Sequence, residues 1–248
     1  MTTDQTNNGK RAPRDECLQN LRLHFGHLNG RAVLEPLLRD VFKGRVAAWS
    51  SFGAESAVLL HMISNVDPGT PILFVDTGKL FPETLAYRDR LIANLGLTGV
   101  RTLSQEKAEQ ERLDRDGMLW QTDPDTCCAI RKVAPLAGNL TPFAALITGR
   151  KRYQAATRSS LQVIEQVDGC IKINPLAGWS EDRVRTYMSE HDLPDHPLVW
   201  SGYLSIGCAP CTMSVKSGEH ARTGRWRGRE KTECGIHFAG GRSVGQNA

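Results

Sequence analysis

Five of the seven cysteines stand in three short segments that could do chemistry together. Cys127 and Cys128 are adjacent, and Cys208 and Cys211 form a Cys-x-x-Cys pair. Two such pairs, far apart in the sequence, indicate a four-thiolate metal site that ties the fold together. Cys234 stands on a polar, glycine-rich tail, which is typical of a reactive thiol.

The spacing of the two pairs does not decide which metal they bind. Zinc and iron–sulfur clusters both accept four thiolates, and adjacent cysteines are an unusual version of the zinc Cys-x-x-Cys knuckle. A vicinal disulfide between Cys127 and Cys128 is a further alternative, although such bonds are rare in a reducing compartment. Cys17 and Cys170 have no partner in this pattern, and we expect both to be small buried hydrophobic residues.

A lysine follows the adjacent cysteines at helical spacing. Asp125 or Thr126 could cap a helix that begins at Cys127, where the helix dipole favours thiolates. Lys132 comes four residues after Cys128, on the same face of that helix. One interpretation is a cation held beside the thiolates, and the alternative is a solvated surface lysine.

The cysteine near the end of the chain has basic neighbours. Lys231 stands three residues before Cys234 and His237 three residues after it. Both would stabilise a thiolate if they lie close to it in space. The alternative is a tail cysteine without function, but exposed free thiols are a liability that proteins avoid.

Charge is unevenly spread along the 248 residues, whose formal net charge is +4. Between Lys216 and Arg229, five basic residues stand against Glu219 alone. This segment predicts an anionic ligand, with a solvated basic tail as the alternative.

The start of the chain is polar and lacks the apolar region of a secretory signal. No apolar run approaches the roughly 20 residues that a membrane span requires. We therefore expect a cytoplasmic protein whose thiols stay reduced, which favours metal or redox chemistry over a disulfide framework. The odd number of cysteines agrees with this interpretation.

Short apolar runs alternate with helical periodicities, which predicts an α/β fold with a mostly parallel sheet covered by helices. Strands are expected at residues 45–50, 71–75, 100–103 and 144–148. Helices are expected at 16–42 with a break near Gly30, at 57–64, 82–95 and 106–116, and from about Thr126. We expect residues 1–15 to be disordered, 16–215 to form a single domain, and 216–248 to form a flexible C-terminal arm that carries Cys234.

Three polar, glycine-containing segments follow predicted strands, at 50–56, 76–79 and 149–152. Ligands of open parallel sheets bind beyond the carboxyl ends of the strands. The first segment could bind a phosphate through backbone N–H groups, although many such turns are structural. Asp76 could accept a hydrogen bond from a ribose hydroxyl, although Asp more often stabilises a turn. The basic residues Arg150, Lys151 and Arg152 could bind an anion.

In these motifs the chain resembles the assimilatory sulfonucleotide reductases, and closely the bacterial adenylyl-sulfate (APS) reductases that carry a [4Fe–4S] cluster. The likeness runs from about Arg45 to Phe238. Its most specific elements are Cys127-Cys128 with Cys208-x-x-Cys211, and Glu233-Cys234-Gly235-Ile236-His237. It implies a pyrophosphatase-type loop fold, similar to that of the adenine nucleotide α-hydrolases and related to ATP-dependent sulfurylase and amidotransferase domains.

The resemblance also implies roles for individual residues. The cysteines that would bind one [4Fe–4S] cluster per chain are Cys127, Cys128, Cys208 and Cys211. The substrate would be bound by Ser50, Ser51, Phe52 and Gly53 of a modified phosphate loop, by Asp76, Thr77 and Gly78 of a nucleotide loop, and by Arg152, Arg222 and Arg225. Cys234 would be the nucleophile, with His237 as its neighbour, and Lys132 would lie between cluster and substrate.

The implied activity is reduction of APS to sulfite and AMP through an S-sulfocysteine on Cys234, in sulfate assimilation toward cysteine. The implied reductant is thioredoxin or glutaredoxin, and no nucleic acid or membrane partner is expected. The chain departs from the family at Tyr153-Gln154-Ala155, where Asp-Gln-Ser or similar is expected, and its first 44 residues carry no family motif.

Three alternatives remain at this point. The first is the same chemistry on the 3′-phosphorylated substrate, PAPS, whose extra phosphate Arg150 or Lys151 could reach; we expect APS to be preferred. The second is an iron–sulfur nucleotide-binding sensor without turnover, which would not need Cys234. The third is an ATP-using sulfurtransferase or adenylyl-transferring enzyme of the same fold, which residues 51–55 disfavour because they lack the paired glycines of a pyrophosphate loop.

Overall fold

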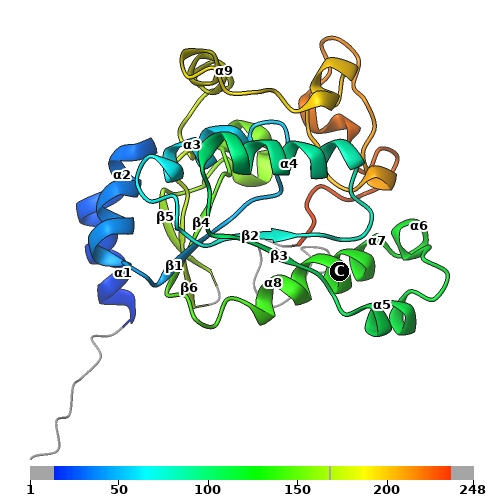
Figure 1. Ribbon diagram of the computed structural model, residues 1–248, viewed down its shortest axis with the longest axis horizontal. Coiled ribbons are helices and arrows are strands. Elements are labelled where there is room, and N and C mark those ends of the chain that lie inside the picture. Colours follow the sequence, from blue (N-terminus) through cyan, green and yellow to red (C-terminus); the bar gives the residue numbers. More distant parts are fainter. Residues whose placement is uncertain (1–13, 168, 236–248) are drawn as a thin grey trace, which may run out of the picture.

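The computed structural model describes residues 14–167 and 169–235. Its centre is a six-stranded sheet with the strand order β3-β2-β1-β4-β6-β5 (Figure 1). Neighbouring strands are parallel except β5 and β6, which pair antiparallel at one edge. The strands are β1 Val46–Trp49, β2 Ile72–Val75, β3 Val100–Leu103, β4 Ala145–Thr148, β5 Ile164–Val167 and β6 Cys170–Ile173.

Helices connect the parallel strands. The α-helices are α1 Arg14–Phe25, α2 Gly30–Pro36, α3 Ser56–Ser64, α4 Pro82–Leu95, α5 Lys107–Leu113, α6 Leu119–Thr122, α7 Pro124–Cys128, α8 Ala134–Gly138 and α9 Glu181–Glu190. Two π-helical segments continue them, η1 Leu37–Val41 after α2 and η2 Ala129–Val133 between α7 and α8. Short 3₁₀ turns occur at η3 Arg152–Gln154, η4 Ala156–Arg158, η5 Pro197–Ser201, η6 Ala209–Cys211 and η7 Ala221–Gly224.

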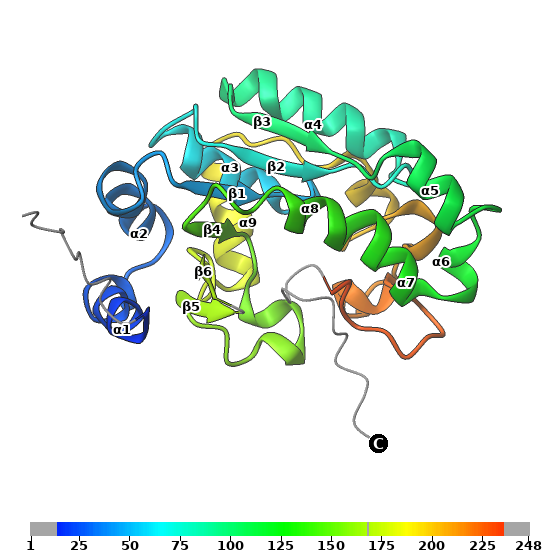
Figure 2. The same ribbon diagram turned by 90° about the horizontal axis from the view of Figure 1, so that it is seen from below.

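The central strands are apolar along their length because helices cover both faces of the sheet. Helices α3 and α4 lie over one face, and α8 lies over the other (Figures 1 and 2). Successive side chains of a strand point to opposite faces. Ala48 and Phe74 therefore belong to the larger core cluster, while Ala47 and Leu73 pack with Leu136 of α8 in a second cluster.

The order of the strands reverses at β1, since β2 and β3 lie on one side of it and β4 lies on the other. Trp49 of β1 pairs in register with Thr148 of β4, so the two strands end side by side. Open α/β sheets bind ligands at such a point. Two of the polar segments predicted to bind a ligand leave from these two strand ends.

The sequence-based expectations for the fold are largely confirmed. The four predicted strands are present, and α4 has the predicted bounds. The predicted helix at 16–42 is divided into α1, α2 and η1, with its break just before Gly30. The β5–β6 hairpin and α9 were not predicted.

One expectation about the cysteines is wrong. Cys17 is exposed, because Leu18, Leu21 and Phe25 occupy the buried face of α1, and Cys170 is half-buried. In the described part of the chain, no helix is both long enough and apolar enough to cross a membrane. Most of the predicted disordered N-terminus and the last residues of the predicted arm lie outside the described residues.

Candidate active site

A cavity of about 900 Å³ lies beyond the carboxyl ends of β1 and β4. Elements that are far apart in sequence meet in its wall: the loop after β1, the loop after β2, η2, η7 and the C-terminal arm. The predicted site residues that line it are Ser50, Ser51, Gly53, Thr77, Lys132, Arg222, Arg225 and Cys234.

The loop after β1 is held in shape by its own residues. The backbone N–H of Phe52 donates to the hydroxyl of Ser50 (3.1 Å), and Phe52 adopts a positive φ of 48°. The ring of Phe52 is fully buried and meets Phe74 edge-on, with 5.3 Å between the ring centroids. Phe52 therefore anchors the loop from below, while Ser51 and Gly53 face the cavity beside the start of α3.

The loop after β2 connects the cavity to the cysteines. The carboxylate of Asp76 accepts from the N–H of Gly78 (2.9 Å), which makes Asp76 a turn-stabilising residue. Thr77 is buried, and its hydroxyl lies 3.2 Å from the sulfur of Cys208. The N–H of Lys79 donates to the same hydroxyl oxygen (3.2 Å), so Thr77 can direct its proton to the sulfur.

The four predicted metal ligands come from two elements that lie against this loop. Cys127 and Cys128 are buried at the end of α7, while Cys208 and Cys211 flank the η6 turn. The N–H of Cys211 donates to the carbonyl of Cys208 (3.0 Å), and Cys208 forms an isolated β-bridge with Leu80. The structure thus brings the two pairs together from a sequence separation of about 80 residues.

The electrostatics of the thiols differ. Burial alone would raise the pKa of Cys208, but the Lys132 ammonium and the Thr77 hydroxyl lower it below the usual value. Burial raises the pKa of Cys127 and Cys211, and it raises that of Cys128 to about 11. Without a bound cation, three of the thiols would therefore be neutral, whereas coordination to a metal deprotonates a thiol.

The cap of the cysteine helix differs from the expectation. Helix α7 begins earlier than predicted, at Pro124, and its N-cap is Asp123, not Asp125 or Thr126. The Asp123 carboxylate accepts from the N–H of Thr126 (3.0 Å). Pro124 occupies the first helical position, where its missing N–H costs nothing.

Lys132 is not a solvated lysine. It is buried, and its ammonium is near enough to Cys208 to lower the pKa of that thiol. Burial disfavours its charged form, but the attraction of Cys208, Cys234 and Cys128 outweighs burial and raises the pKa of Lys132 above its usual value. A permanently protonated ammonium therefore lies between the cluster of thiols and the cavity.

Arg131, next to it, holds η2 in place. Its guanidinium forms a buried ion pair with Asp114 (2.8 Å) and donates to the carbonyl of Thr77 (2.9 Å). Neither Arg131 nor Asp114 was predicted as a site residue.

The arm from Lys216 to Gly235 lies against the body of the protein. Trp226 is buried, and its backbone N–H donates to the carbonyl of Cys211 (3.1 Å). Lys231 pairs with Asp125 of α7. These contacts bring Cys234 to the cavity, where it packs on the sheet face covered by α8. Whether the arm also moves stays a prediction.

The two predicted substrate-binding arginines of the arm have different surroundings. Arg222 donates to the carbonyl of Thr232 and lies 3.2 Å from the Glu233 carboxylate. Arg225 stacks on the ring of Trp226, with its guanidinium carbon 4.4 Å from the ring centroid. Its Nε is buried and has no hydrogen-bond partner among the described residues, which leaves it available to a ligand.

The basic residues after β4 are already paired. Arg150 forms an ion pair with Glu165, and the buried Lys151 forms one with Glu55 (2.8 Å). Glu55 also accepts from Tyr153 and Gln154. These partners take up both cations that we considered for a 3′-phosphate.

Several predicted site residues do not face the cavity. Phe52 is buried beneath it, and Asp76 and Gly78 form a turn at its edge. Arg152 is exposed, and its Nε donates to the carbonyl of Leu161 (2.8 Å). His237 lies outside the described residues.

Arg158 and Glu55 are among the residues that line the cavity and were not predicted as site residues. Arg158 points into it from η4, and Glu55 organises the residues of η3. A glutamate beside the phosphate loop was a visible signal for Glu55. Nothing local distinguished Arg158 from Arg152, since only the turns η3 and η4 decide which arginine faces inward.

Comparisons with known proteins agree with this site. Residues 45–214 match the model of the phosphoadenosine phosphosulfate reductase domain family. A protein of Mesorhizobium japonicum named adenosine 5′-phosphosulfate reductase is 52% identical over 216 residues, covering 87% of this chain and 85% of the relative. A protein of Chelativorans sp. with the same name is 47% identical over 236 residues, covering 93% of this chain and 96% of the relative. A Gloeobacter violaceus protein named phosphoadenosine 5′-phosphosulfate reductase is 40% identical over 226 residues, covering 89% and 93%.

One solved structure supports the same family, and another shares its fold. The phosphoadenylyl-sulfate reductase of Candida auris superposes with a TM-score of 0.68 at 28% identity, covering 83% of this chain and 100% of that one. The FMN adenylyltransferase of Candida glabrata, at 13% identity and a TM-score of 0.55, covers 91% of this chain and 78% of its own and shares only the fold. By its sequence and its structure, the chain belongs to the phosphoadenosine phosphosulfate reductase domain family.

Proposed function

We propose that the protein reduces adenylyl sulfate to sulfite and AMP, with a dithiol protein such as thioredoxin or glutaredoxin as reductant. The observation that carries this proposal is the position of Cys234 in a cavity formed by a phosphate-type loop, Lys132 and Arg225. The names of the relatives at 52% and 47% identity support the same activity. A nucleotide-binding sensor would have no use for a thiol at this place.

We also propose that Cys127, Cys128, Cys208 and Cys211 hold one [4Fe–4S] cluster. Lys132 interacts electrostatically with Cys128, Cys208 and Cys211, and the Thr77 hydroxyl lies 3.2 Å from the sulfur of Cys208, a positive and hydrogen-bonding environment that suits an anionic thiolate cluster. The relatives named adenosine 5′-phosphosulfate reductase fit an iron–sulfur enzyme, which favours the cluster over zinc.

The protein's own residues then account for the reaction. The Cys234 thiolate attacks the sulfate sulfur, a new S–S bond forms, and the bond from sulfur to the bridging oxygen breaks, so AMP leaves with the bonding electrons. Lys132, Arg225 and the backbone N–H groups of the loop after β1 would stabilise the charge that develops on the AMP phosphate. The bound cluster would supply electrostatic and structural support beside Lys132.

Release of sulfite needs the reductant. A thiolate of the reductant attacks the Cys234 sulfur of the S-sulfocysteine, and sulfite leaves. The second thiol of the reductant then breaks the mixed disulfide, which regenerates Cys234 and leaves the reductant oxidised by two electrons. The arm would have to open for this step, because Cys234 is half-buried in the closed arrangement.

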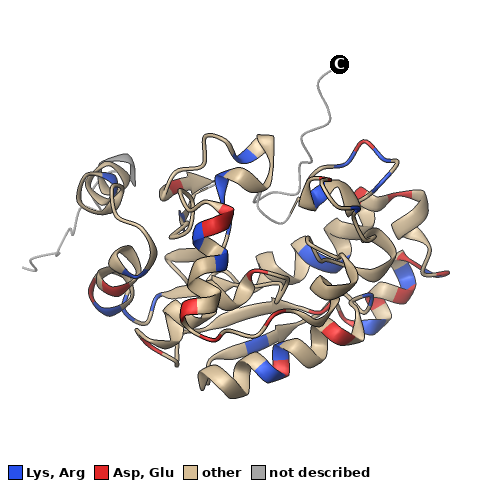
Figure 3. Cartoon of the chain, turned by 90° about the horizontal axis from the view of Figure 1, so that it is seen from above, with Lys and Arg blue, Asp and Glu red and all other residues tan. Residues whose placement is uncertain are grey.

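The second candidate substrate is PAPS, the substrate in the name of the Gloeobacter relative. The internal ion pairs of Arg150 and Lys151 argue for APS, because an added phosphate dianion would have no free cation there. We expect kcat/KM to favour APS by at least about tenfold, equal to about 1.4 kcal/mol. We also propose a cytoplasmic location and no nucleic acid partner. The absence of such a partner is supported by the distribution of charge, since Lys and Arg are interspersed with Asp and Glu over the described part (Figure 3).

One assay tests the activity: sulfite release from APS and from PAPS with thioredoxin as reductant. Cys234→Ser should abolish release. Wild-type protein mixed with APS without reductant should gain the mass of one SO₃ group on Cys234. An adduct on another cysteine, or turnover by Cys234→Ser, would contradict the mechanism.

The cluster is tested separately by metal analysis. Protein purified without air should contain about four irons and four sulfides per chain. Replacing any one of the four proposed ligand cysteines by serine should lower the iron content. One zinc per chain in such protein would contradict the assignment.

A further inference from the structure

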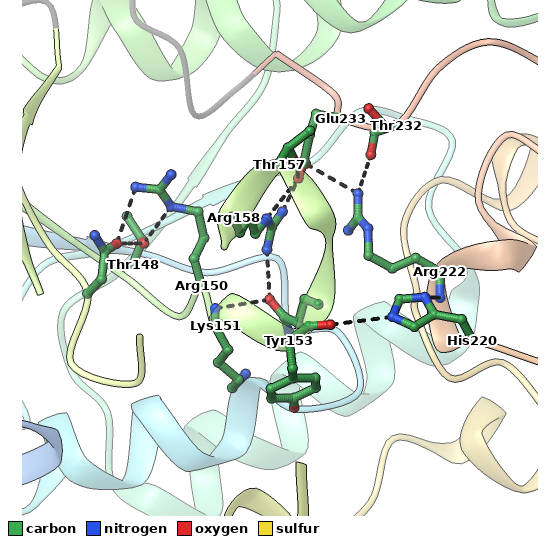
Figure 4. Close-up of polar contacts among 12 residues, drawn as sticks. Thr148, Arg150, Lys151, Tyr153, Thr157, Arg158, His220, Arg222, Thr232 and Glu233 are labelled. Atoms are coloured by element: carbon green, nitrogen blue, oxygen red, sulfur yellow. Dashed lines mark hydrogen bonds and ion pairs between the residues drawn. The ribbon is translucent and has the colours of Figure 1, made fainter. Parts of the chain in front are cut away.

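The residue just before the proposed nucleophile is held by two arginines from different parts of the fold (Figure 4). Arg158 donates to both carboxylate oxygens of Glu233, from Nε to Oε1 (2.7 Å) and from Nη2 to Oε2 (2.8 Å). Arg222 lies 3.2 Å from Oε2 through its Nη2. A bidentate pair of this kind fixes orientation as well as distance.

The body of the protein holds Arg158 rigidly. Its side chain is 9% exposed, and its Nη1 donates to the side-chain oxygen of Gln154 (2.7 Å). Gln154 in turn donates to Glu55 (2.7 Å), beside the phosphate-type loop. The carboxylate of the arm is therefore connected by three successive polar contacts to the floor of the cavity.

Arg222 completes the contact from the side of the arm. It belongs to η7 and also donates to the carbonyl of Thr232, next to Glu233. Thr232 and Glu233 are thereby bound between Arg158 of η4 in the body and Arg222 of η7 in the arm (Figure 4).

The Glu233 carboxylate is ionised in this arrangement. Burial would raise the pKa of Glu233, but Arg158 and Arg222 together lower it below the usual value, so the carboxylate stays ionised. Glu233 is 12% exposed, and its loss would leave the buried Arg158 and the half-buried Arg222 without their shared partner.

We propose that Glu233 is a positioning residue for Cys234, and that Arg158 acts on the nucleophile through Glu233. The Cα atoms of consecutive residues are about 3.8 Å apart, so a bound Glu233 leaves Cys234 few positions. The clamp, meaning Glu233 with Arg158 and Arg222, holds the thiol in the cavity with Lys132. Attack on a bound sulfate requires such a near-attack position, and small displacements slow the reaction strongly.

This inference rests on the proposed function. Its consequences differ from those of a direct contact between Arg158 and the substrate. If the clamp positions the nucleophile, its loss slows attack and frees the thiol toward other reagents, while nucleotide affinity stays the same. If Arg158 acted only by holding substrate, its loss would weaken nucleotide binding and leave the free thiol unchanged.

The test compares Glu233→Gln, Glu233→Asp and Arg158→Lys with wild type. Three quantities are measured: the single-turnover rate of SO₃ addition to Cys234 from APS without reductant, the rate of alkylation of Cys234 by iodoacetamide without substrate, and the affinity for AMP. Peptide mass spectrometry assigns both modifications to Cys234. Glu230→Gln is the matched control, because Glu230 is an exposed glutamate three residues earlier on the same arm.

For Glu233→Gln we expect SO₃ addition at least tenfold slower, alkylation several-fold faster, and AMP affinity within twofold of wild type. Glu233→Asp keeps the charge and should recover part of the rate. Arg158→Lys keeps a cation but loses the bidentate geometry, so it should resemble Glu233→Gln. The control should match wild type in all three measurements.

Two outcomes would overturn the inference. Unchanged SO₃ addition and alkylation in Glu233→Gln would show that the clamp does not position the thiol. A parallel loss of AMP affinity and SO₃ addition, with unchanged alkylation, would assign the arginines to substrate binding. Failure of the proposed function looks different, since wild type itself would then form no adduct, while alkylation would still report whether the clamp holds the arm.

Discussion

At the scale of the residue, Lys132 has the clearest electrostatic role. It is a buried ammonium beside Cys208 and Cys234. Lys132→Ala should slow SO₃ addition to Cys234 about ten- to a hundredfold, because one charge-assisted contact contributes about 1.5–3 kcal/mol. Single-turnover mass spectrometry measures this rate.

Lys132→Arg should retain part of that rate, and Lys107→Ala, on the exposed surface of α5, should retain all of it. Lys151→Ala is a poor control, although its position in the sequence suggests it, because Lys151 is buried against Glu55. A wild-type rate in Lys132→Ala would show that this ammonium does not act on the reaction.

The residues of the site were predictable to different degrees. The types and spacing of the cysteines predicted that the two pairs lie together. Ligands of one metal site must meet in space even where they are far apart in the sequence. The choice between Arg152 and Arg158 was not predictable, because two consecutive 3₁₀ turns decide which side chain enters the cavity. The partners of Arg150 and Lys151 also depend on tertiary contacts that no local pattern records.

At the scale of the element, α7 presents two of the cysteines, and its N-cap determines where the helix begins. Asp123→Ala removes the acceptor of the Thr126 N–H and should cost about 1 kcal/mol of helix stability. Because Cys127 and Cys128 stand in the next turn, the variant should lose iron to a chelator faster than wild type. Asp123→Ser restores a cap and should restore slow iron loss.

Asp116→Ala is the matched control for this element. Asp116 also accepts a backbone N–H, that of Met118 (3.0 Å), but its turn carries no cysteine. Equal rates of iron loss in Asp123→Ala and Asp116→Ala would show that the cap of α7 does not influence retention of the cluster.

Elements with a strong pattern of their own were the predictable ones. Helix α4 has a proline at its first position and Gly96 in the left-handed conformation after its end, so both of its bounds were readable. The β5–β6 hairpin was missed although Asp168-Gly169 stands between two β-rich runs, a common hairpin signal. Helix α9 was missed because its sequence is mostly polar and only Val184 is fully buried.

At the scale of the whole molecule, one buried histidine links the sheet domain to the segment that carries the second cysteine pair. His196 is fully buried, and its ring lies 3.0 Å from the hydroxyl of Thr84 on α4. The N–H of Leu198 donates to Nδ1 (3.2 Å), so the neutral ring carries its proton on Nε2 and donates to Thr84. Protonation of Nδ1 would break the hydrogen bond from the Leu198 N–H, and the new N–H of the ring would face that donor instead of an acceptor.

This histidine should make the protein sensitive to mild acid. Burial lowers the pKa of His196 from 6.5 to about 4, so the unfolded chain takes up the proton first as pH falls. The contribution of His196 to the free energy of unfolding is therefore fully present above about pH 6.5. It declines progressively between pH 6.5 and 4, by about 1.4 kcal/mol for each pH unit.

Between pH 7.5 and 5.5, the titration of this residue should lower the melting temperature of wild type by a few degrees, since 1 kcal/mol corresponds to about 2–4 °C for a protein of this size. His196→Gln, whose side chain does not titrate, should be less stable at neutral pH but should lose less on acidification. Melting curves of both proteins, recorded anaerobically at the two pH values, measure the difference, and equal losses would show that His196 does not couple the two parts of the fold to pH.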